Sequence, residues 1–123
     1  MAQALGKGSV VAVVGSGAMG TGIAQVAAAA GYKVVLFDAR PEAVKASITG
    51  ICNIYGKLAE KGKMTDEEVQ AASDRLSGAS SLAELKDAAI VIEAIVENLE
   101  VKRTLFADLE GIVHDDCILA TNT

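Results

Sequence analysis

The chain has 123 residues, of which 51% are hydrophobic and 22% charged, and this is the composition of one globular domain rather than of a disordered segment. The formal net charge is −5 and aromatic residues make up 3%, which argues against a nucleic-acid surface built on positive charge and base stacking. No stretch approaches the ~18 uninterrupted apolar residues of a membrane span. We therefore expect a cytoplasmic protein with no nucleic-acid partner and no membrane partner.

The two cysteines, Cys52 and Cys117, stand far apart in the chain and form no C-x-x-C pair. This spacing indicates neither a zinc site nor a disulfide framework. We predict that both are buried small hydrophobic side chains in a reducing compartment. The sequence thus predicts no metal site.

The first part of the chain predicts a strand, a helix and a second strand. After a loose leader over residues 1–8, residues 10–14 form a continuous β-branched run that stops at a glycine, as expected of a strand buried on both faces. Residues 19–30 favour a helix that ends at Gly31, and a second buried strand follows at 34–37. This order is a βαβ unit and implies a parallel sheet.

A pair of helices is predicted next. Pro41 occupies a first-turn position, and a long helix follows until Gly62. Thr65 and Glu68 form a capping box that begins a second helix, which runs to about Arg75. The apolar stripe of the long helix comprises Val44, Ile48, Ile51, Tyr55 and Leu58, and the turn between the helices is basic through Lys57, Lys61 and Lys63.

The remaining segments continue the alternation of strands and helices. A weak strand over 76–80 and a helical turn over 82–85 precede a confident strand over 89–92 and a final strand over 117–120. Between the last two, a helix begins at Asn98, and its inward side chains are Leu105, Phe106, Leu109 and Ile112. The fold class is therefore α/β, a Rossmann-type doubly wound parallel sheet with a helical-pair insertion after the second strand.

Residues 15–20 carry the pattern G-x-G-x-x-G between a predicted strand and a predicted helix. In this position Gly15 allows a tight turn, Gly17 lets a pyrophosphate approach the backbone, and Gly20 lets the helix and strand pack closely. The helix N-terminus faces the negative charge. We predict a dinucleotide site here rather than a glycine-rich turn without a ligand, with Gly15, Ser16, Gly17, Ala18, Met19 and Gly20 as cofactor-binding residues.

Asp38 follows the second predicted strand, about 20 residues after the last glycine of the pattern, where a carboxylate accepts hydrogen bonds from the adenosine ribose. Its charge should repel a 2′-phosphate, so NAD is the favoured cofactor. Arg40, two residues on, keeps NADP as the alternative and is itself a candidate cofactor contact. Asp38 also suits the role of a capping residue before the helix at Pro41.

Three segments resemble the NAD-binding domain of 3-hydroxyacyl-CoA dehydrogenases, including bacterial 3-hydroxybutyryl-CoA dehydrogenases. They are VVGSGAMGTGIAQVAAAAGYKVVLFDAR, VIEAIVENLEVKRTLF and the terminal ATNT. The resemblance covers residues 9–123, and the second segment is the most specific. The resemblance implies that Glu97, Lys102 and Asn122 lie near the nicotinamide half of NAD and that Glu93 is structural. Contacts to the CoA phosphates are implied for Lys57, Lys61 and Lys63, of which Lys61 is the best candidate.

The resemblance also implies that the domain spans residues 9–123 and is cut off before the catalytic motif and the C-terminal helical domain. The family's substrate serine, catalytic histidine and partner glutamate would all follow Thr123, so no catalytic residue is expected in this chain. We interpret the sole histidine, His114, as a surface-loop residue. Thr121 departs from the serine that begins the family's Ser-Asn-Thr motif.

The sequence therefore predicts the NAD-binding part of an oxidoreductase that converts a 3-hydroxyacyl-CoA to the 3-ketoacyl-CoA, in fatty acid or related acyl-CoA metabolism. The full-length enzyme is expected to be a homodimer through its C-terminal domain, and this chain alone is expected to be inactive. Two alternatives are another β-hydroxyacid or 6-phosphogluconate-type dehydrogenase, and a stand-alone NAD-sensing module without chemistry.

Overall fold

A computed structural model describes residues 9–95 and 99–121 of the chain. The elements are, in order, β1 (Val10–Val14), α1 (Ala18–Ala29), β2 (Lys33–Phe37), α2 (Pro41–Glu60), α3 (Asp66–Asp74), β3 (Leu76–Gly78), the 3₁₀ helix η1 (Leu82–Leu85), β4 (Ile90–Glu93), α4 (Leu99–Glu110) and β5 (Ile118–Thr121). Each predicted strand and helix is present at its expected place in the chain.

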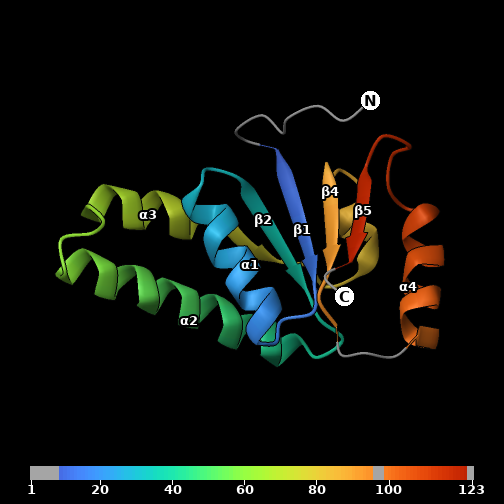
Figure 1. The fold of residues 1–123 in the computed structure, drawn as a ribbon, viewed down its shortest axis with the longest axis horizontal. Helices are drawn as coiled ribbons and strands as arrows, with labels where there is room; N and C mark the ends of the chain where they lie inside the picture. The colour runs from blue at the N-terminus through green and yellow to red at the C-terminus, as the bar shows by residue number, and fades with distance from the viewer. Residues whose placement is uncertain (1–8, 96–98, 122–123) are drawn as a thin grey trace.

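The five strands form one parallel sheet in the order β3-β2-β1-β4-β5 (Figure 1). From β1 the chain first moves outward through β2 to β3, and it then returns to the other side of β1 at β4. This reversal makes the sheet doubly wound, so the predicted Rossmann-type fold is confirmed. The helical pair α2 and α3 is inserted between β2 and β3, also as predicted.

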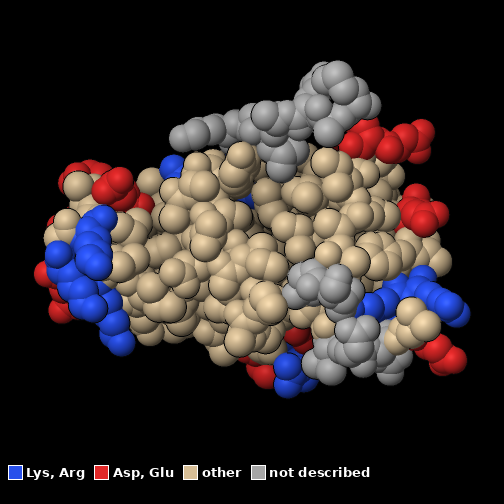
Figure 2. Space-filling view, viewed as in Figure 1, with Lys and Arg blue, Asp and Glu red and all other residues tan. Residues whose placement is uncertain are grey.

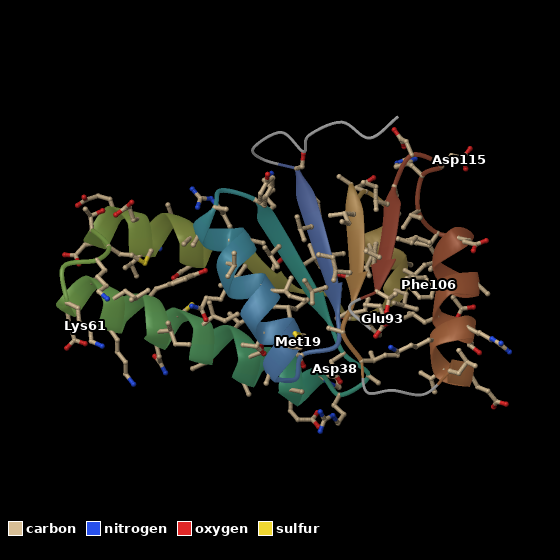
Figure 3. All side chains as sticks on the ribbon, in the orientation of Figure 1. Met19, Asp38, Lys61, Glu93, Phe106 and Asp115 are labelled. Atoms are coloured by element: carbon tan, nitrogen blue, oxygen red, sulfur yellow. The ribbon has the colours of Figure 1, made fainter. Side chains whose placement is uncertain are left out.

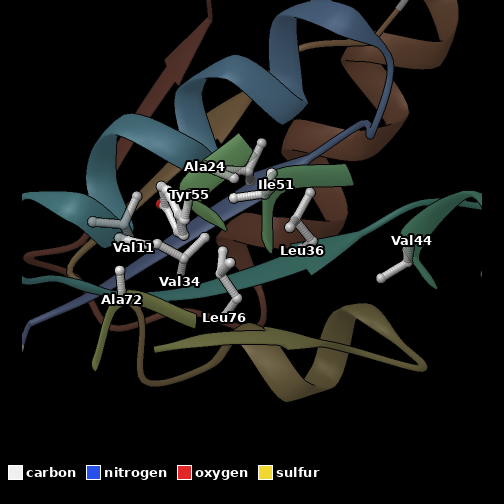
Figure 4. Close-up of a cluster of buried hydrophobic side chains, with 11 residues drawn as sticks. Val11, Ala24, Val34, Leu36, Val44, Ile51, Tyr55, Ala72 and Leu76 are labelled. Carbon is white, nitrogen blue, oxygen red and sulfur yellow. The ribbon is translucent and has the colours of Figure 1, made fainter. Parts of the chain in front are cut away.

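Each face of the sheet has its own hydrophobic core. On one face, Val11 and Val13 of β1 pack with α1, α2 and α3, and Figure 4 shows this cluster around Ile51 and Tyr55. On the other face, Ala12 and Val14 pack with η1 and α4. Because both faces are covered, neighbouring residues of β1 are all apolar, and this explains the unbroken β-branched run in the sequence.

The helical insertion is held by local hydrogen bonds. In the capping box of α3, the Glu68 N–H donates to Thr65 Oγ1 at 3.1 Å, and the Thr65 N–H donates to Glu68 Oε1 at 2.8 Å. Gly62 has a φ of +73°, so α2 ends there in a left-handed conformation that favours glycine. In the described part of the chain, no helix combines the length and the apolar character needed to cross a membrane.

Some side chains predicted inside are only half-buried, namely Ile48, Leu58, Phe106, Ile112, Cys52 and Cys117. The reason on α2 is that Ser47, not Ile48, points at α1, where its hydroxyl meets that of Thr21 at 2.6 Å. A hydroxyl inside a helix interface is tolerated because it has this partner. Cys117 directly precedes β5, and Phe106 lines a surface pocket with Thr121 of β5, an edge strand that is paired on one side within the described sheet.

Gly20 generates a stability prediction, because a Cβ on it would lie 1.8 Å from the carbonyl oxygen of Gly15. We expect Gly20→Ala to lower the free energy of unfolding by about 1 to 3 kcal/mol through overpacking. The matched control is Gly22→Ala in the same helix, where a Cβ meets nothing within 4 Å. This control should gain up to about 1 kcal/mol from helix propensity. Urea unfolding followed by circular dichroism measures both changes, and equal stability of the two variants would contradict the close packing.

Candidate functional site

The carboxyl ends of β1, β2 and β4 meet at the point where the strand order reverses. Val14 of β1 pairs with Phe37 of β2 on one side and with Glu93 of β4 on the other. Gly15, Asp38 and Glu93 therefore stand at this edge, and Figure 3 shows the last two flanking the end of β1. A crevice at such a reversal is where doubly wound sheets bind ligands.

The glycine-rich turn after β1 is tight because two of its glycines touch other backbone. Gly15 has a φ of +105°, and its N–H donates to the Phe37 carbonyl at 2.8 Å. A Cβ on Gly15 would lie 2.8 Å from the carbonyl oxygen of Ala94, and one on Gly20 would strike Gly15. Both glycines therefore have the packing roles that the sequence predicted.

Gly17 differs from these two glycines, since a Cβ on it would meet nothing within 4 Å. It is the N-cap residue of α1, with φ −72° and ψ −168°, and no side chain of the described residues caps the helix there. Gly17, Ala18 and Met19 are all exposed. The first N–H groups of α1 thus face open space, which is the arrangement that binds a phosphate group.

Asp38 is tied to the glycine-rich turn by short hydrogen bonds. Its Oδ2 accepts from the N–H and from the hydroxyl of Ser16, both at 2.9 Å, and its Oδ1 accepts from the Arg40 N–H at 2.9 Å. The Arg40 guanidinium, 70% exposed, adds an ion pair at 3.6 Å. Burial acts to raise the pKa of Asp38, but the hydrogen bonds from Arg40 and Ser16 and the charge of Arg40 outweigh it, so the pKa is lowered. The group is a carboxylate at neutral pH.

Glu93, the last residue of β4, is fully buried and has partners on three sides. Oε1 accepts from the Thr121 hydroxyl at 2.6 Å and lies 3.3 Å from the Lys102 ammonium, while Oε2 accepts from the Ile95 N–H at 2.6 Å. Burial alone would raise the pKa of Glu93, but these hydrogen bonds and the Lys102 charge lower it. Lys102 is itself only 6% exposed, so the two form a buried ion pair.

The departure at Thr121 from the family's serine is explained by this network. Either residue type carries the hydroxyl that donates to Glu93, so the hydrogen bond does not depend on which one is present. The sequence pointed to Lys102 but did not indicate that Glu93 and Thr121 form one cluster with it. In the sequence, the only sign of this cluster was that Glu93, an acidic residue, ends an apolar strand.

A groove of about 510 Å³ opens between α1 and α2, and the sequence analysis did not predict it. It begins at Ser16 and Gly17 and extends along α2 as far as Ile54. Its walls are built mostly of small residues, including Gly22, Ala43, Ala46 and Gly50. At its base, the Thr21 hydroxyl donates to the Ser16 carbonyl at 3.1 Å and meets the Ser47 hydroxyl, which links the glycine-rich turn to α2.

The three predicted lysines lie apart from this edge. Lys57, Lys61 and Lys63 are exposed around the turn between α2 and α3, and Figure 2 shows basic side chains gathered at that end of the molecule. Glu97 and Asn122 lie outside the described residues. Within the described part of the chain, no group of His, Cys, Asp and Glu is arranged to hold a metal ion.

Comparison with known proteins agrees with this geometry. Residues 10–123 match the family model described as 3-hydroxyacyl-CoA dehydrogenase, NAD binding domain. The chain is 43% identical over 113 residues to a probable 3-hydroxybutyryl-CoA dehydrogenase of Bacillus subtilis, a match that covers 92% of the chain and 39% of the relative. It is 42% identical over 113 residues to a 3-hydroxyadipyl-CoA dehydrogenase of Escherichia coli, covering 92% of the chain and 24% of the relative.

Solved structures give the same result. The crystal structure of 3-hydroxybutyryl-CoA dehydrogenase from Escherichia coli K12 superposes with a TM-score of 0.92 at 41% sequence identity. That match covers 97% of this chain and 25% of the other chain. The chain therefore spans well under half the length of the proteins that it matches.

The buried ion pair generates a prediction about acid stability. The pKa of Glu93 is lowered in the folded chain, so its contribution to the free energy of unfolding is present above the unfolded pKa, near 4.5, and is lost as the pH falls through the folded value. Glu93→Gln leaves the Lys102 charge buried, and we expect it to cost about 3 kcal/mol at neutral pH. Urea unfolding over a pH series should show the parent and variant curves converging in acid. A difference that stays constant into the acid range would contradict the pairing.

Proposed function

The chain belongs to the family of 3-hydroxyacyl-CoA dehydrogenase NAD-binding domains, and on this premise we propose that it is the dinucleotide-binding part of an enzyme that oxidises a 3-hydroxyacyl-CoA to the 3-ketoacyl-CoA. The observation that carries the proposal is the open backbone at Gly17, beside the ionised Asp38. NAD supplies the hydride acceptor for such an oxidation. The protein's task at this edge is to bind and orient that cofactor.

We propose a place for each half of the cofactor from the order of the groups along this edge. Asp38, which follows β2, would accept hydrogen bonds from the adenosine ribose hydroxyls. Within the protein, its Oδ1 accepts one hydrogen bond and its Oδ2 accepts two. The pyrophosphate would lie at the N-terminus of α1, against Gly17. The nicotinamide half would then lie beyond β1, over the ends of β4 and β5. Lys102, with Glu97 and Asn122 by resemblance, is the candidate contact there.

The groove between α1 and α2 supports an acyl-CoA as the second ligand. It connects the glycine-rich turn with Ile54, which is 39% exposed on α2. Lys57 and Lys61 follow Ile54 at three and seven residues, so they continue the same side of the helix. We propose that the CoA phosphates bind there, with Lys61 and Lys63 at the turn. An acyl-CoA bound in this way would extend from the basic surface, through a largely uncharged groove, to the edge where the cofactor binds.

We propose a cytoplasmic enzyme, in keeping with the two free cysteines, Cys52 and Cys117. The homodimer is inferred from the family resemblance alone and would involve parts of the enzyme other than this chain. Involvement in fatty acid oxidation is supported by a relative named fatty acid oxidation complex subunit alpha, which is 38% identical over 112 residues.

The cofactor assignment predicts that the chain binds NADH more tightly than NADPH, because the ionised Asp38 disfavours a 2′-phosphate. Asp38→Ala should weaken NADH binding by about 1 to 3 kcal/mol, the scale for hydrogen bonds to a charged group. Asp38→Asn, which keeps the shape of the side chain but not its charge, should narrow the preference between the two cofactors. Isothermal titration calorimetry measures the NADH and NADPH affinities of the parent chain and of both variants. NADPH binding to the parent chain as tightly as NADH would reject the assignment.

The substrate assignment predicts that Lys61→Ala weakens CoA binding to this chain. The expected loss is about twofold to fivefold, because an exposed lysine is screened by solvent. Lys33→Ala is the matched control, since Lys33 is an exposed lysine at the start of β2, far from the turn between α2 and α3. Equal CoA affinities for the two variants, measured by calorimetry at low salt, would count against a phosphate contact at Lys61.

We expect the chain alone to show no dehydrogenase turnover with NAD and 3-hydroxybutyryl-CoA. Hydride transfer from an alcohol leaves a proton that a positioned base must accept. His114 is 70% exposed and pairs with Asp87 at 3.6 Å, at the amino end of β5. Figure 3 shows its neighbour Asp115 at the opposite end of the sheet from Asp38. The absorbance of NADH reports the rate, and turnover that is abolished by His114→Ala would show that the active site is misplaced.

A further inference from the structure

Glu93 is a fully buried carboxylate at the edge of the sheet. A charged group with no exposure loses its hydration, and a buried ion pair is often no more stabilising than apolar residues of the same volume. The same strand position pairs with Val14 and Thr121 in the neighbouring strands, at the very edge where the ligand site lies. The place of the carboxylate therefore suggests a role in that site.

The Glu93 side chain contacts three parts of the structure, namely β5, α4 and the segment after β4. Oε1 reaches the hydroxyl of Thr121 at the end of β5 and the ammonium of Lys102 in the first part of α4. Oε2 accepts from the Ile95 N–H, and the backbone of Ala94 and Ile95 is in contact with Gly15. A shift of the carboxylate would thus move both Lys102 and the backbone that supports the first glycine of the turn.

A dinucleotide bound as proposed would extend from β2 towards β4. Asp38 follows β2, and the pyrophosphate would lie at the N-terminus of α1, beside β1. Figure 3 shows Glu93 on the side of β1 away from Asp38, between the strand ends and α4. The adenosine half would then lie away from Glu93, and the nicotinamide half would approach it.

We propose that Glu93 is a positioning residue for the nicotinamide half of the cofactor and that it acts by holding the Lys102 ammonium at the ends of β4 and β5. The inference rests on the proposed function, because it requires a bound dinucleotide. It assigns Glu93 a role that neither the sequence pattern nor a purely structural ion pair requires. Glu93 itself does not touch the cofactor.

The test compares two ligands that share the adenosine half. NADH carries both halves, whereas ADP carries the adenosine and the two phosphates only. Glu93→Gln and Lys102→Met should each weaken NADH binding about tenfold or more, the scale for losing a charged hydrogen-bond partner. ADP affinity should stay within about twofold, and the double variant should bind NADH no more weakly than either single variant, because coupled residues are not additive. Glu67→Gln, an exposed glutamate on α3, is the matched control.

The outcomes separate the inference from the function on which it rests. Equal losses of NADH and ADP affinity in Glu93→Gln would show a general structural role and overturn the proposal, as would unchanged NADH affinity. If Glu93→Gln does not fold, Thr121→Val replaces it, because Thr121 is exposed and the substitution removes the hydroxyl that donates to Oε1. This variant should lose about threefold in NADH affinity and nothing in ADP affinity; no NADH-selective loss overturns the proposal. Failure of the parent chain to bind NADH would instead reject the proposed function.

Discussion

The near contact between the start of α1 and the ends of β1 and β4 is the constraint on which the rest of the site depends. Gly20 lies so close to the Gly15 carbonyl that a single methyl group would collide with it, and Gly15 is similarly close to Ala94. This approach brings the N-terminus of α1 over the strand ends and leaves Gly17 open beside it. The helix N–H groups, the strand ends and a carboxylate after β2 therefore converge on one edge, which is where we propose that the dinucleotide binds.

Two carboxylates flank the end of β1, and their surroundings give them different tasks. The Asp38 side chain is 13% exposed, and its hydrogen bonds come from the glycine-rich turn and from Arg40, so it is ionised. Glu93 is buried, and its carboxylate forms an ion pair with Lys102 and accepts hydrogen bonds from Thr121 and a backbone N–H. In our proposal, Asp38 contacts the cofactor, while Glu93 positions the residues around it. Two carboxylates can have these different roles because their burial and their hydrogen-bond partners differ.

The local part of this arrangement was predictable from the sequence. Unbroken apolar runs indicated buried parallel strands, the capping box at Thr65 marked the start of α3, and the spacing of Gly15, Gly17 and Gly20 indicated the turn. Contacts between distant segments were not predictable in the same way. The pairing of Glu93 with Lys102 and the burial of Ser47 in place of Ile48 depend on how helices cross strands, and no periodicity in one segment records that.

We propose that the pyrophosphate of NAD binds against the backbone at Gly17. Fluorescence titration of Gly17→Val with NADH tests this proposal. The residue has a negative φ and an extended backbone, and a Cβ there meets no protein atom within 4 Å, so the variant should fold, with a loss of about 1 kcal/mol because valine is a poorer N-cap residue than glycine. We expect NADH binding to be lost while the variant still unfolds cooperatively. A stable Gly17→Val chain that binds NADH with the parent's affinity would contradict it.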